Sequence, residues 1–394
     1  MPNANLSPPE SRVTPWEVRG EVDYDRLVRD FAAQYLSENL YRRFPSPPHV
    51  LLRRKFFYAH RDLEMFFSSY ERGQPVSIVT GRGPSGRMHI GHIIVFYFAK
   101  WLQQRTGAVL HIPLSDDEKY FVRDRSMKEI HQYTMDNIAD ILAVGFDPER
   151  TRIIVDTLDG DVVYPLAALY SKSVNYSTVK AVYGTSFTNL GWIFYPSVQT
   201  AHLLLPQVLL GSHETLVPIA IDQDPHVRLS RDIAGLSRFR VKKPVSVMSK
   251  FLPTLEDPRG KMSTTDPNKV IWLDDDYPRI KQKLMRFAFS GAHTSLEMHR
   301  KIGADLEKDV AYLLLFYLFE DDDSKIAQIG EGYRAGKLTT GEVKEYAAKK
   351  IDEFLQQHRE RKRQLAEDVN NILDRFRLTG DERERVLKYV YDTE

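Results

Sequence analysis

A glycine-rich turn between a β-like stretch and a pair of histidines constrains this chain more than any other feature. Val76 to Thr80 is rich in β-branched residues, and the glycines and proline of Gly81 to Gly86 exclude a helix. The string His89-Ile90-Gly91-His92 follows at the start of a helical stretch. This order predicts one strand–turn–helix unit of a parallel α/β sheet, with backbone N–H groups and imidazoles placed to meet phosphates.

A second string, Lys261-Met262-Ser263-Thr264-Thr265, lies in a loop that runs from Asp257 to Pro267. Proline, glycine and aspartate bound this loop, so the sequence predicts a mobile lysine. Such a lysine can neutralise charge that develops on a leaving phosphate group. Together the two strings predict a site for a nucleoside triphosphate.

Composition narrows the class of protein. The 394 residues are enough for two to three domains with a large core. The net charge of +1 indicates no global basic field, so any RNA site must be a local patch. Cysteine is absent, which excludes disulfides and thiolate metal sites. No apolar run has transmembrane length and Met1 to Ser11 lacks a signal-peptide core, so we expect a soluble, cytoplasmic enzyme without a membrane partner.

The prolines divide the chain. All 21 lie at or before Pro278, so no proline would interrupt helices in the residues that follow. Thr339 and Glu342 form a capping-box signature, and apolar residues recur at helical spacing from there until Gly380 breaks the run. Val310 to Phe319 is apolar on nearly all sides and predicts a buried helix. We therefore expect a helical domain over residues 276–394.

The first 275 residues predict two further units. Residues 1–75 form an N-terminal extension with a helical segment near Tyr24 to Leu40. Residues 76–275 form a Rossmann-like parallel α/β domain, in which Ser126 with Glu129 begins a helix that Gly145 ends. Residues 157–212 are aromatic and less regular. The remaining strands of this domain are predicted at Val109 to Leu114, Arg152 to Val155 and Thr215 to Ile221.

The glycine turn has a rival interpretation. Gly81 to Gly86 also fits G-x-G-x-x-G, the fingerprint of an NAD-dependent oxidoreductase. That fingerprint requires an acidic residue about 20 positions later, yet none occurs between Gly86 and Asp116. From the turn alone, the ligand could be a nicotinamide cofactor or ATP. The loop that carries Lys261 favours ATP.

The two strings resemble the HIGH and KMSKS motifs of class I aminoacyl-tRNA synthetases. The chain further resembles the tryptophanyl-tRNA synthetases of archaeal and eukaryotic type from about Thr14 to the C-terminal helices. The segments that carry this resemblance include Thr14 to Val18, Val22 to Leu27, Arg53 to Phe57, Ala59 to Asp62, Asp116 to Tyr120, Tyr195 to Gln199, Ala220 to Pro225 and Glu320 to Asp323.

The resemblance implies roles for individual residues. His89 and His92 would contact the ATP phosphates, Gly91 would leave room for adenine, and Lys261 would neutralise pyrophosphate. The catalytic set is therefore Lys261, His89 and His92, and ATP would also be bound by Arg82, Gly83, Gly91, Asp222, Met262 and Ser263. The substrate's ammonium and carboxylate would be held by Glu118, Gln199 and Gln223. His89 and His92 could instead bind zinc, but no third ligand is evident, so we predict no protein metal site.

Two positions depart from the family pattern. Eukaryotic relatives have Tyr and Gln that read the indole N–H, where this chain has Val79 and Pro113 in the amino-acid pocket. An unpaired buried N–H costs ~1–3 kcal/mol, so another acceptor is needed, and His111, Ser115 or a backbone carbonyl could serve. The tyrosyl-tRNA synthetases are the nearest alternative family.

The resemblance also implies substrates and partners. These are L-tryptophan, ATP with Mg²⁺, tRNA(Trp) and a second copy of the chain, which would pair through a segment inserted at about 156–213. Arg359, Arg361, Lys362 and Arg363 form a basic cluster that either contacts RNA or is a solvated helix face. Glu320 to Asp323 predicts a solvated helix-start loop, since acidic side chains favour helix N-termini.

Overall fold

The computed structural model describes residues 12–16, 18–19, 22–184, 187–262, 266–293 and 295–393. Among these residues, seven strands form one sheet in the order β3-β4-β9-β8-β5-β6-β7. Its five parallel strands are β9 (Val245–Ser249), β8 (Glu214–Ala220), β5 (Val76–Val79), β6 (Val109–Leu114) and β7 (Thr151–Val155). β4 (Phe57–Arg61) and β3 (Gln34–Tyr35) extend the β9 edge in antiparallel register. The predicted α/β class is confirmed, and the sheet is mostly parallel.

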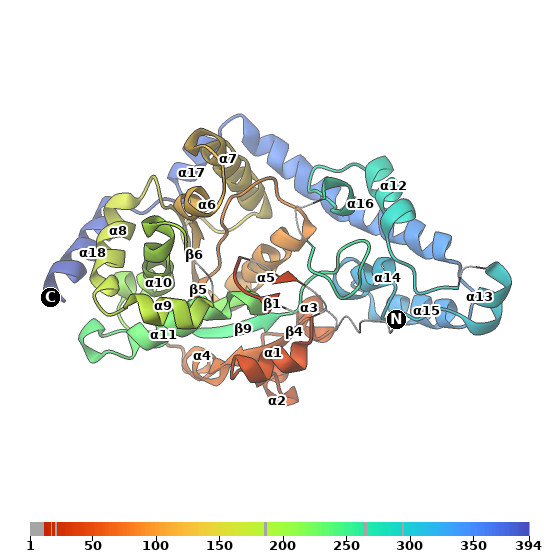
Figure 1. Ribbon diagram of the computed structural model, residues 1–394, viewed down its shortest axis with the longest axis horizontal. Coiled ribbons are helices and arrows are strands. Elements are labelled where there is room, and N and C mark those ends of the chain that lie inside the picture. The colour runs from red at the N-terminus through yellow and green to blue at the C-terminus, as the bar shows by residue number, and fades with distance from the viewer. Residues whose placement is uncertain are drawn as a thin grey trace, which may run out of the picture.

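Helices cover both faces of the sheet (Figure 1). α4 (Leu63–Glu71), α5 (Ile90–Thr106) and α7 (Met127–Val144) contribute to one apolar core, and α8 (Gly160–Ser171), α10 (Leu190–Leu210) and α11 (Asp224–Ala234) contribute to a second. Neighbouring residues of β7 alternate between them: Ile153 belongs to the first core and Ile154 to the second. This alternation is what a strand buried on both faces requires.

The predicted strands of the parallel sheet and both predicted capping boxes are present. β6 has the predicted bounds, and the bounds of β5, β7 and β8 differ by one residue. Ser126 caps α7 with Glu129, Gly145 ends it in the left-handed region, and Thr339 caps α16 (Thr340–Ala366) with Glu342. Val310 to Phe319 is a helix, α14 (Val310–Leu314) continued by a π-helical turn (Leu315–Phe319).

Three expectations about elements were wrong. The helical segment near Tyr24 to Leu40 is divided into α1 (Tyr24–Asp30), β3 and α2 (Glu38–Arg43), because Ala32 adopts a positive φ of 49°. Residues 157–212 are largely helical, since they contain α8, α9 (Tyr176–Tyr183) and α10. Gly380 does not end the C-terminal run: that run already breaks after α16 and α17 (Val369–Asp374), and Gly380 begins α18 (Gly380–Asp392).

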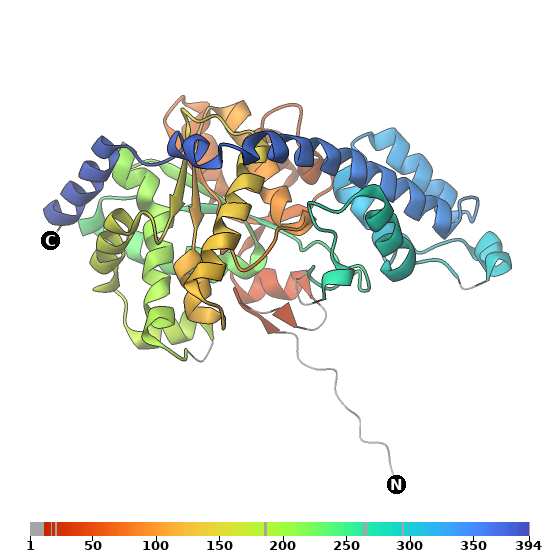
Figure 2. The same ribbon diagram turned by 90° about the horizontal axis from the view of Figure 1, so that it is seen from above.

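The helical region after the sheet comprises α12 (Tyr277–Phe287), α13 (Leu296–Ile302), α14, α15 (Asp323–Arg334) and α16. Figures 1 and 2 show α16 running from this region back to the sheet, where α17 and α18 lie. α18 packs against α8 and α10, and Ile153 of the edge strand β7 donates a hydrogen bond to Phe376 O at 2.8 Å. The chain thus ends on the α/β domain. The division at residues 75 and 275 stays a prediction.

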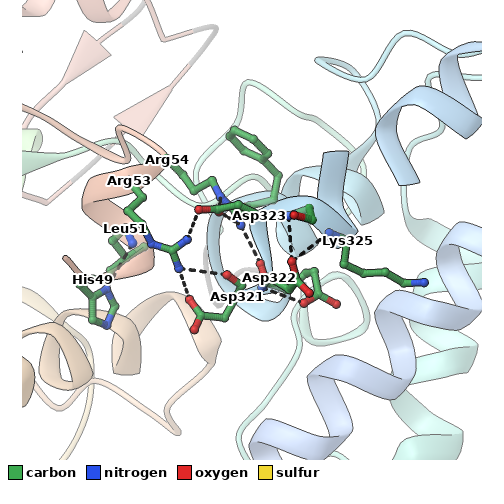
Figure 3. A network of polar contacts seen from close by, with 11 residues as sticks. His49, Leu51, Arg53, Arg54, Asp321, Asp322, Asp323 and Lys325 are labelled. Carbon is green, nitrogen blue, oxygen red and sulfur yellow. Dashed lines mark hydrogen bonds and ion pairs between the residues drawn. The ribbon is translucent and has the colours of Figure 1, made fainter. Parts of the chain in front are cut away.

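An ion-pair cluster ties the N-terminal segment to the helical region (Figure 3). Arg53 and Arg54, at the end of α3 (Val50–Arg53), contact the acidic loop before α15. Asp321 and Asp323 accept from the two guanidinium groups, and Asp322 caps α15 through Ser324 N and Lys325 N. Glu320 is buried against Tyr346. The acidic loop therefore starts a helix as predicted, but it is not merely solvated.

No helix in the part of the chain that the structure describes has both the length and the apolar character needed to cross a bilayer.

Candidate active site

A pocket of about 330 Å³ opens at the carboxyl ends of β5, β6 and β8. From β5 the chain builds outward through β6 to β7 and then crosses to β8 and β9 on the other side of β5, so the strand order reverses between β5 and β8. Such a switch point is where open α/β sheets bind ligands. The two signature strings meet here, since the pocket is lined by His89, Gly91, His92, Lys261 and Met262.

The glycine turn approaches β6 closely. Arg82 N donates to Pro113 O, and Ser115 N donates to Arg82 O, each at 3.0 Å. A Cβ atom added at Gly81 would lie 2.3 Å from Pro113 O, so a larger residue cannot follow β5 without moving the backbone. At Gly83 an added Cβ would meet the side-chain ends of Lys119 and Glu118, which can move, so the requirement for glycine is strongest at Gly81. The turn therefore requires glycine for close approach at the pocket wall.

The two histidines are held as neutral donors. His89 Nδ1 accepts from Gly91 N at 3.1 Å, and His92 Nδ1 accepts from His89 N at 3.2 Å, so in both rings the proton is on Nε2. Burial, reinforced by Arg82 and Lys261, holds the pKa of both imidazoles well below their ordinary value. His89 Nε2 is buried and has no partner among the described residues. It is a donor prepared for an anionic oxygen.

The lysine of the second string points into the pocket. Lys261 Nζ pairs with the buried carboxylate of Asp222 and lies 5.0 Å from the centre of the Phe251 ring. Met262 N donates to Leu252 O at 2.9 Å, which anchors the start of the loop beside the sheet. Ser263 and the two threonines after it lie outside the described residues.

Three residues predicted to hold the amino acid, Glu118, Gln199 and Gln223, line the same pocket. Tyr195 Oη donates to Gln199 Oε1 at 2.6 Å and lies 3.0 Å from Ser115 Oγ. Glu118 Oε2 is paired with Lys119 at 2.5 Å. The structure thus brings these polar side chains into one region.

The N-terminal segment covers this region. Trp16 follows β1 (Arg12–Val13) and precedes β2 (Val18–Arg19), and its Nε1 donates to Glu118 Oε1 at 2.8 Å. Gln223 Nε2 donates to Pro15 O at 3.2 Å. The Trp16 ring packs within 6.0 Å of Tyr183, Phe187, Trp192 and His226, measured between ring centres. A tryptophan of the chain itself thus contacts the carboxylate expected to bind the substrate's ammonium.

An apolar wall completes the pocket. Val79 forms a small core with Leu203, Val217 and Val227, and Pro113 lines the pocket nearby. Of the two side chains considered as an indole acceptor, Ser115 lines the pocket. His111 is buried and is not among the lining residues. This wall suits a large flat apolar side chain.

Buried acids support the helix that presents Glu118, α6 (Asp116–Val122). Asp117 accepts from Glu118 N at 2.6 Å and from Tyr164 Oη at 2.8 Å, and Asp156 is 2.7 Å from His202 Nε2. Burial, followed by the charge of Asp156, raises the pKa of Asp117 to about 9. Burial also raises the pKa of Asp156. At neutral pH the two carboxyls therefore do not both carry a charge.

Comparisons with known proteins agree with this geometry. A family described as tRNA synthetases class I (W and Y) matches residues 71–356. The chain is 48% identical over 374 residues to tryptophan--tRNA ligase 2 of Halobacterium salinarum. That alignment covers 95% of this chain and 96% of that protein. It is 42% identical over 368 residues to tryptophan--tRNA ligase of Saccharolobus solfataricus, with 92% and 95% covered. The tryptophanyl-tRNA synthetase structure from Giardia lamblia aligns with a TM-score of 0.83 at 34% identity, covering 91% of this chain and 96% of that one.

The chain belongs to the tryptophanyl-tRNA synthetases of class I, archaeal and eukaryotic type. The family resolves the ambiguity of the glycine turn in favour of ATP. It also excludes the tyrosyl and NAD-dependent alternatives as descriptions of the chain. Among the described residues there is no cluster of three or more His, Cys, Asp or Glu side chains that could hold a metal ion, so His89 and His92 gain no third ligand.

Sequence reasoning missed several residues of this synthetase pocket: Trp16, Lys119, Tyr195, His226 and Phe251. Lys119 and Tyr195 lie within segments that carried the resemblance, so their places in the pocket could have been inferred. Trp16 also lies within such a segment, Thr14 to Val18, but its contact with Glu118 joins positions 102 residues apart and could not be read from the sequence.

Proposed function

We propose that this synthetase activates L-tryptophan with ATP and transfers it to tRNA(Trp). The observation that carries the proposal is a single pocket that combines the donors of His89 and Lys261 with Glu118, Gln199 and an apolar wall. The first group matches the needs of a triphosphate, and the second matches those of an amino acid with a large side chain.

The chemistry is an in-line displacement. The tryptophan carboxylate attacks the ATP α-phosphate, a carboxylate–phosphate bond forms, and pyrophosphate leaves with the electrons of the broken P–O bond. No side-chain nucleophile is needed, so positioning and charge stabilisation provide the rate. His89 and His92 donate to phosphate oxygens through Nε2, Arg82 faces the phosphates, and Lys261 leaves Asp222 to neutralise the pyrophosphate.

Binding contacts hold both substrates in line. Glu118 binds the ammonium of tryptophan, Gln199 and Gln223 orient its carboxylate end, and Val79 and Pro113 pack on the indole. Gly83 and Gly91 let the nucleotide approach the backbone, Met262 and Ser263 flank it, and Asp222 reaches the ribose. Mg²⁺ arrives with ATP and is held by phosphate oxygens, which fits a pocket where the described residues form no metal cage.

A hydroxyl of the terminal ribose of tRNA(Trp) then attacks the aminoacyl carbonyl of the adenylate, an ester bond forms, and AMP leaves. The helical region over residues 276–394 reads the anticodon of that tRNA. A second copy of the chain pairs through residues 156–213, and the enzyme works in the cytoplasm, where tRNA is charged. Sedimentation should show a dimer; a monomer at micromolar concentration would refute that assembly.

ATP–pyrophosphate exchange with each of the twenty amino acids tests the activity. We expect exchange that depends on tryptophan and Mg²⁺. Exchange with tyrosine alone would refute the substrate, and NAD(H) binding without any exchange would refute the reaction.

Phenylalanine lacks the indole N–H, so it should be activated far less well than tryptophan if Ser115 or a backbone carbonyl accepts that hydrogen bond. Activation of phenylalanine within about tenfold of tryptophan would show that the shape of the pocket alone selects the substrate.

Restoring Tyr and Gln together (Val79→Tyr with Pro113→Gln) should not lower the KM for tryptophan. Val79 is packed in the wall formed by Leu203, Val217 and Val227, and added bulk there costs packing energy. A lower KM in the same exchange assay would show that the pocket still has room for the two side chains.

A further inference from the structure

The basic cluster of α16 points into the protein. Lys362 Nζ lies 2.7 Å from Asp136 Oδ1 and 3.0 Å from Asp140 Oδ1, both on α7. Arg361 donates to Tyr97 Oη at 2.8 Å, and Arg359 donates to Asp275 O. Arg363 is the exposed member, with 77% of its side chain accessible. Three of the four cations therefore form contacts within the protein, with Asp275, with Tyr97 of α5 and with the carboxylates of α7.

Asp140 is the centre of this junction. Its side chain is almost fully buried, and it is shared between Lys362 and His358 of α16. His358 is itself fully buried, with Nε2 3.2 Å from Asp140 Oδ1 and Nδ1 3.0 Å from Tyr97 Oη. Tyr97 lies on α5, the helix that begins with the His89–His92 string. The helical region is thus joined to the two helices behind the phosphate end of the pocket.

The same turn of α7 holds Arg82 on its pocket side. Arg82 Nε donates to Asn137 Oδ1, and Asn137 Nδ2 donates to Gly86 O at 3.0 Å. Among the described residues no carboxylate forms an ion pair with Arg82. Burial lowers the pKa of Arg82 to about 10, and the charges of Asp140 and Asp136 oppose that effect. Asp136 directly precedes Asn137 in α7 and Asp140 follows it by three residues, so the carboxylates that Lys362 pairs with lie beside the residue that holds Arg82.

We propose that Lys362 and Asp140 act on the ATP phosphates through Arg82, as a buried charge relay between α16 and the nucleotide site. Asp140 and Asp136 partly offset the positive charge that Arg82 presents to a triphosphate, and Lys362 in turn offsets the two carboxylates. The ion pairs that join α16 to α7 thereby influence the affinity for ATP. This inference rests on the proposed binding of ATP phosphates beside Arg82.

The relay predicts opposite signs for two isosteric changes. Asp140→Asn removes an anion near Arg82, so ATP should bind more tightly because its phosphates then neutralise a less compensated cation. Lys362→Met leaves Asp136 and Asp140 uncompensated, so they should oppose ATP more strongly. A cavity of about 250 Å³ lined by these residues admits solvent, which limits each effect to about threefold.

The experiment is ATP–pyrophosphate exchange at saturating tryptophan without tRNA, so that only the ATP dependence varies. We expect the KM for ATP to fall about threefold in Asp140→Asn and to rise about threefold in Lys362→Met, with kcat nearly unchanged. The double variant should return close to wild type, because the two charges are removed together. His358→Gln is the matched control: it alters the same junction and keeps Lys362, Asp136 and Asp140, so it should lower thermal stability and leave the KM for ATP in place.

Each other outcome overturns the relay. A rise of KM in both single variants would show a junction that only supports the fold, and unchanged KM in both would show that Arg82 does not sense α7. A His358→Gln variant that shifts KM as strongly as Lys362→Met would attribute the effect to packing rather than charge. Absence of exchange in the wild-type protein would refute the proposed function instead, which separates the two conclusions.

Discussion

At the scale of single residues, the phosphate end of the pocket relies on neutral imidazoles and one movable cation. The pKa values of His89 and His92 are held low by burial, so both rings stay neutral through the neutral pH range. They provide directed N–H donors without a charge that would have to be desolvated. In the proposed reaction the cation that moves is Lys261, which pairs with Asp222 in this structure.

Lys261→Ala should slow adenylate formation about a hundredfold while the affinity for tryptophan stays nearly constant. The amine acts on the leaving pyrophosphate, so it contributes mainly in the transition state, where such groups are worth roughly 10²–10³ in rate. Single-turnover kinetics would measure this. Lys269→Ala is the control, because Lys269 lies just after this loop and pairs with Glu256 and Asp266 outside the pocket. An unchanged rate in Lys261→Ala would show that this loop connects two elements and takes no part in adenylate formation.

Asp156→Asn should stabilise the protein increasingly as pH rises. Both Asp117 and Asp156 have raised pKa values in the folded state, so folding is favoured when they are protonated, and that stability is lost as pH rises from about 4 toward the Asp117 pKa of about 9. Asparagine removes a buried carboxyl whose ionisation would be unfavourable and keeps an acceptor for His202. We expect equal melting temperatures at pH 4 and a variant several degrees higher at pH 8.

Asp159→Asn provides the contrasting control, because Asp159 is a buried carboxylate paired with Arg377 and Arg383. That variant should be less stable than wild type near neutral pH. If Asp156→Asn lost stability like Asp159→Asn at pH 8, the ionised Asp156 carboxylate would stabilise the fold, contrary to its raised pKa.

At the scale of elements, local chemistry made some predictions reliable and tertiary packing overrode others. β6 and the capped start of α16 could be predicted because β-branched runs and capping boxes act locally. α10 could not, because Pro196 and Pro206 lie inside it; its burial along most of its length maintains the helix despite the missing N–H groups. The start of α18 was available in the sequence, since Thr379 and Glu382 form a third capping box.

The hairpin that carries Trp16 is an element whose role appears only in three dimensions. Trp16→Phe should raise the KM for tryptophan about fivefold, because Glu118 loses a charge-assisted hydrogen bond that holds it toward the pocket. Steady-state exchange kinetics would show this with kcat little changed. Trp192→Phe is the matched control, since Trp192 Nε1 is buried nearby without a partner in the described residues. Equal effects in both variants would mean that ring packing, and not the hydrogen bond, matters.

At the scale of the whole molecule, the meeting of the two signature strings could be predicted, but the integration of the chain ends could not. β3 and β4 come from the predicted N-terminal extension, yet they pair onto β9 as part of the main sheet. At the opposite edge of the sheet, the hydrogen bond from Ile153 N of β7 to Phe376 O likewise joins residues that no sequence periodicity relates. Such long-range pairing depends on chain topology, which the short sequence periods of strands and helices do not encode.

The ion-pair cluster of Figure 3 should therefore be a determinant of global stability, and its two arginines should contribute unequally. Arg54 is buried and donates to Phe316 O, Glu320 O and Asp323, so Arg54→Met would strand two carbonyls and cost about 3 kcal/mol. Arg53 pairs with the exposed Asp321 and Asp323, so Arg53→Met should cost less than about 1 kcal/mol. Thermal unfolding followed by circular dichroism should show a drop of several degrees for the first variant only. Equal small shifts would make the cluster a surface feature, and the N-terminal segment would then be held to the helical region by apolar packing around Phe56 and Tyr317.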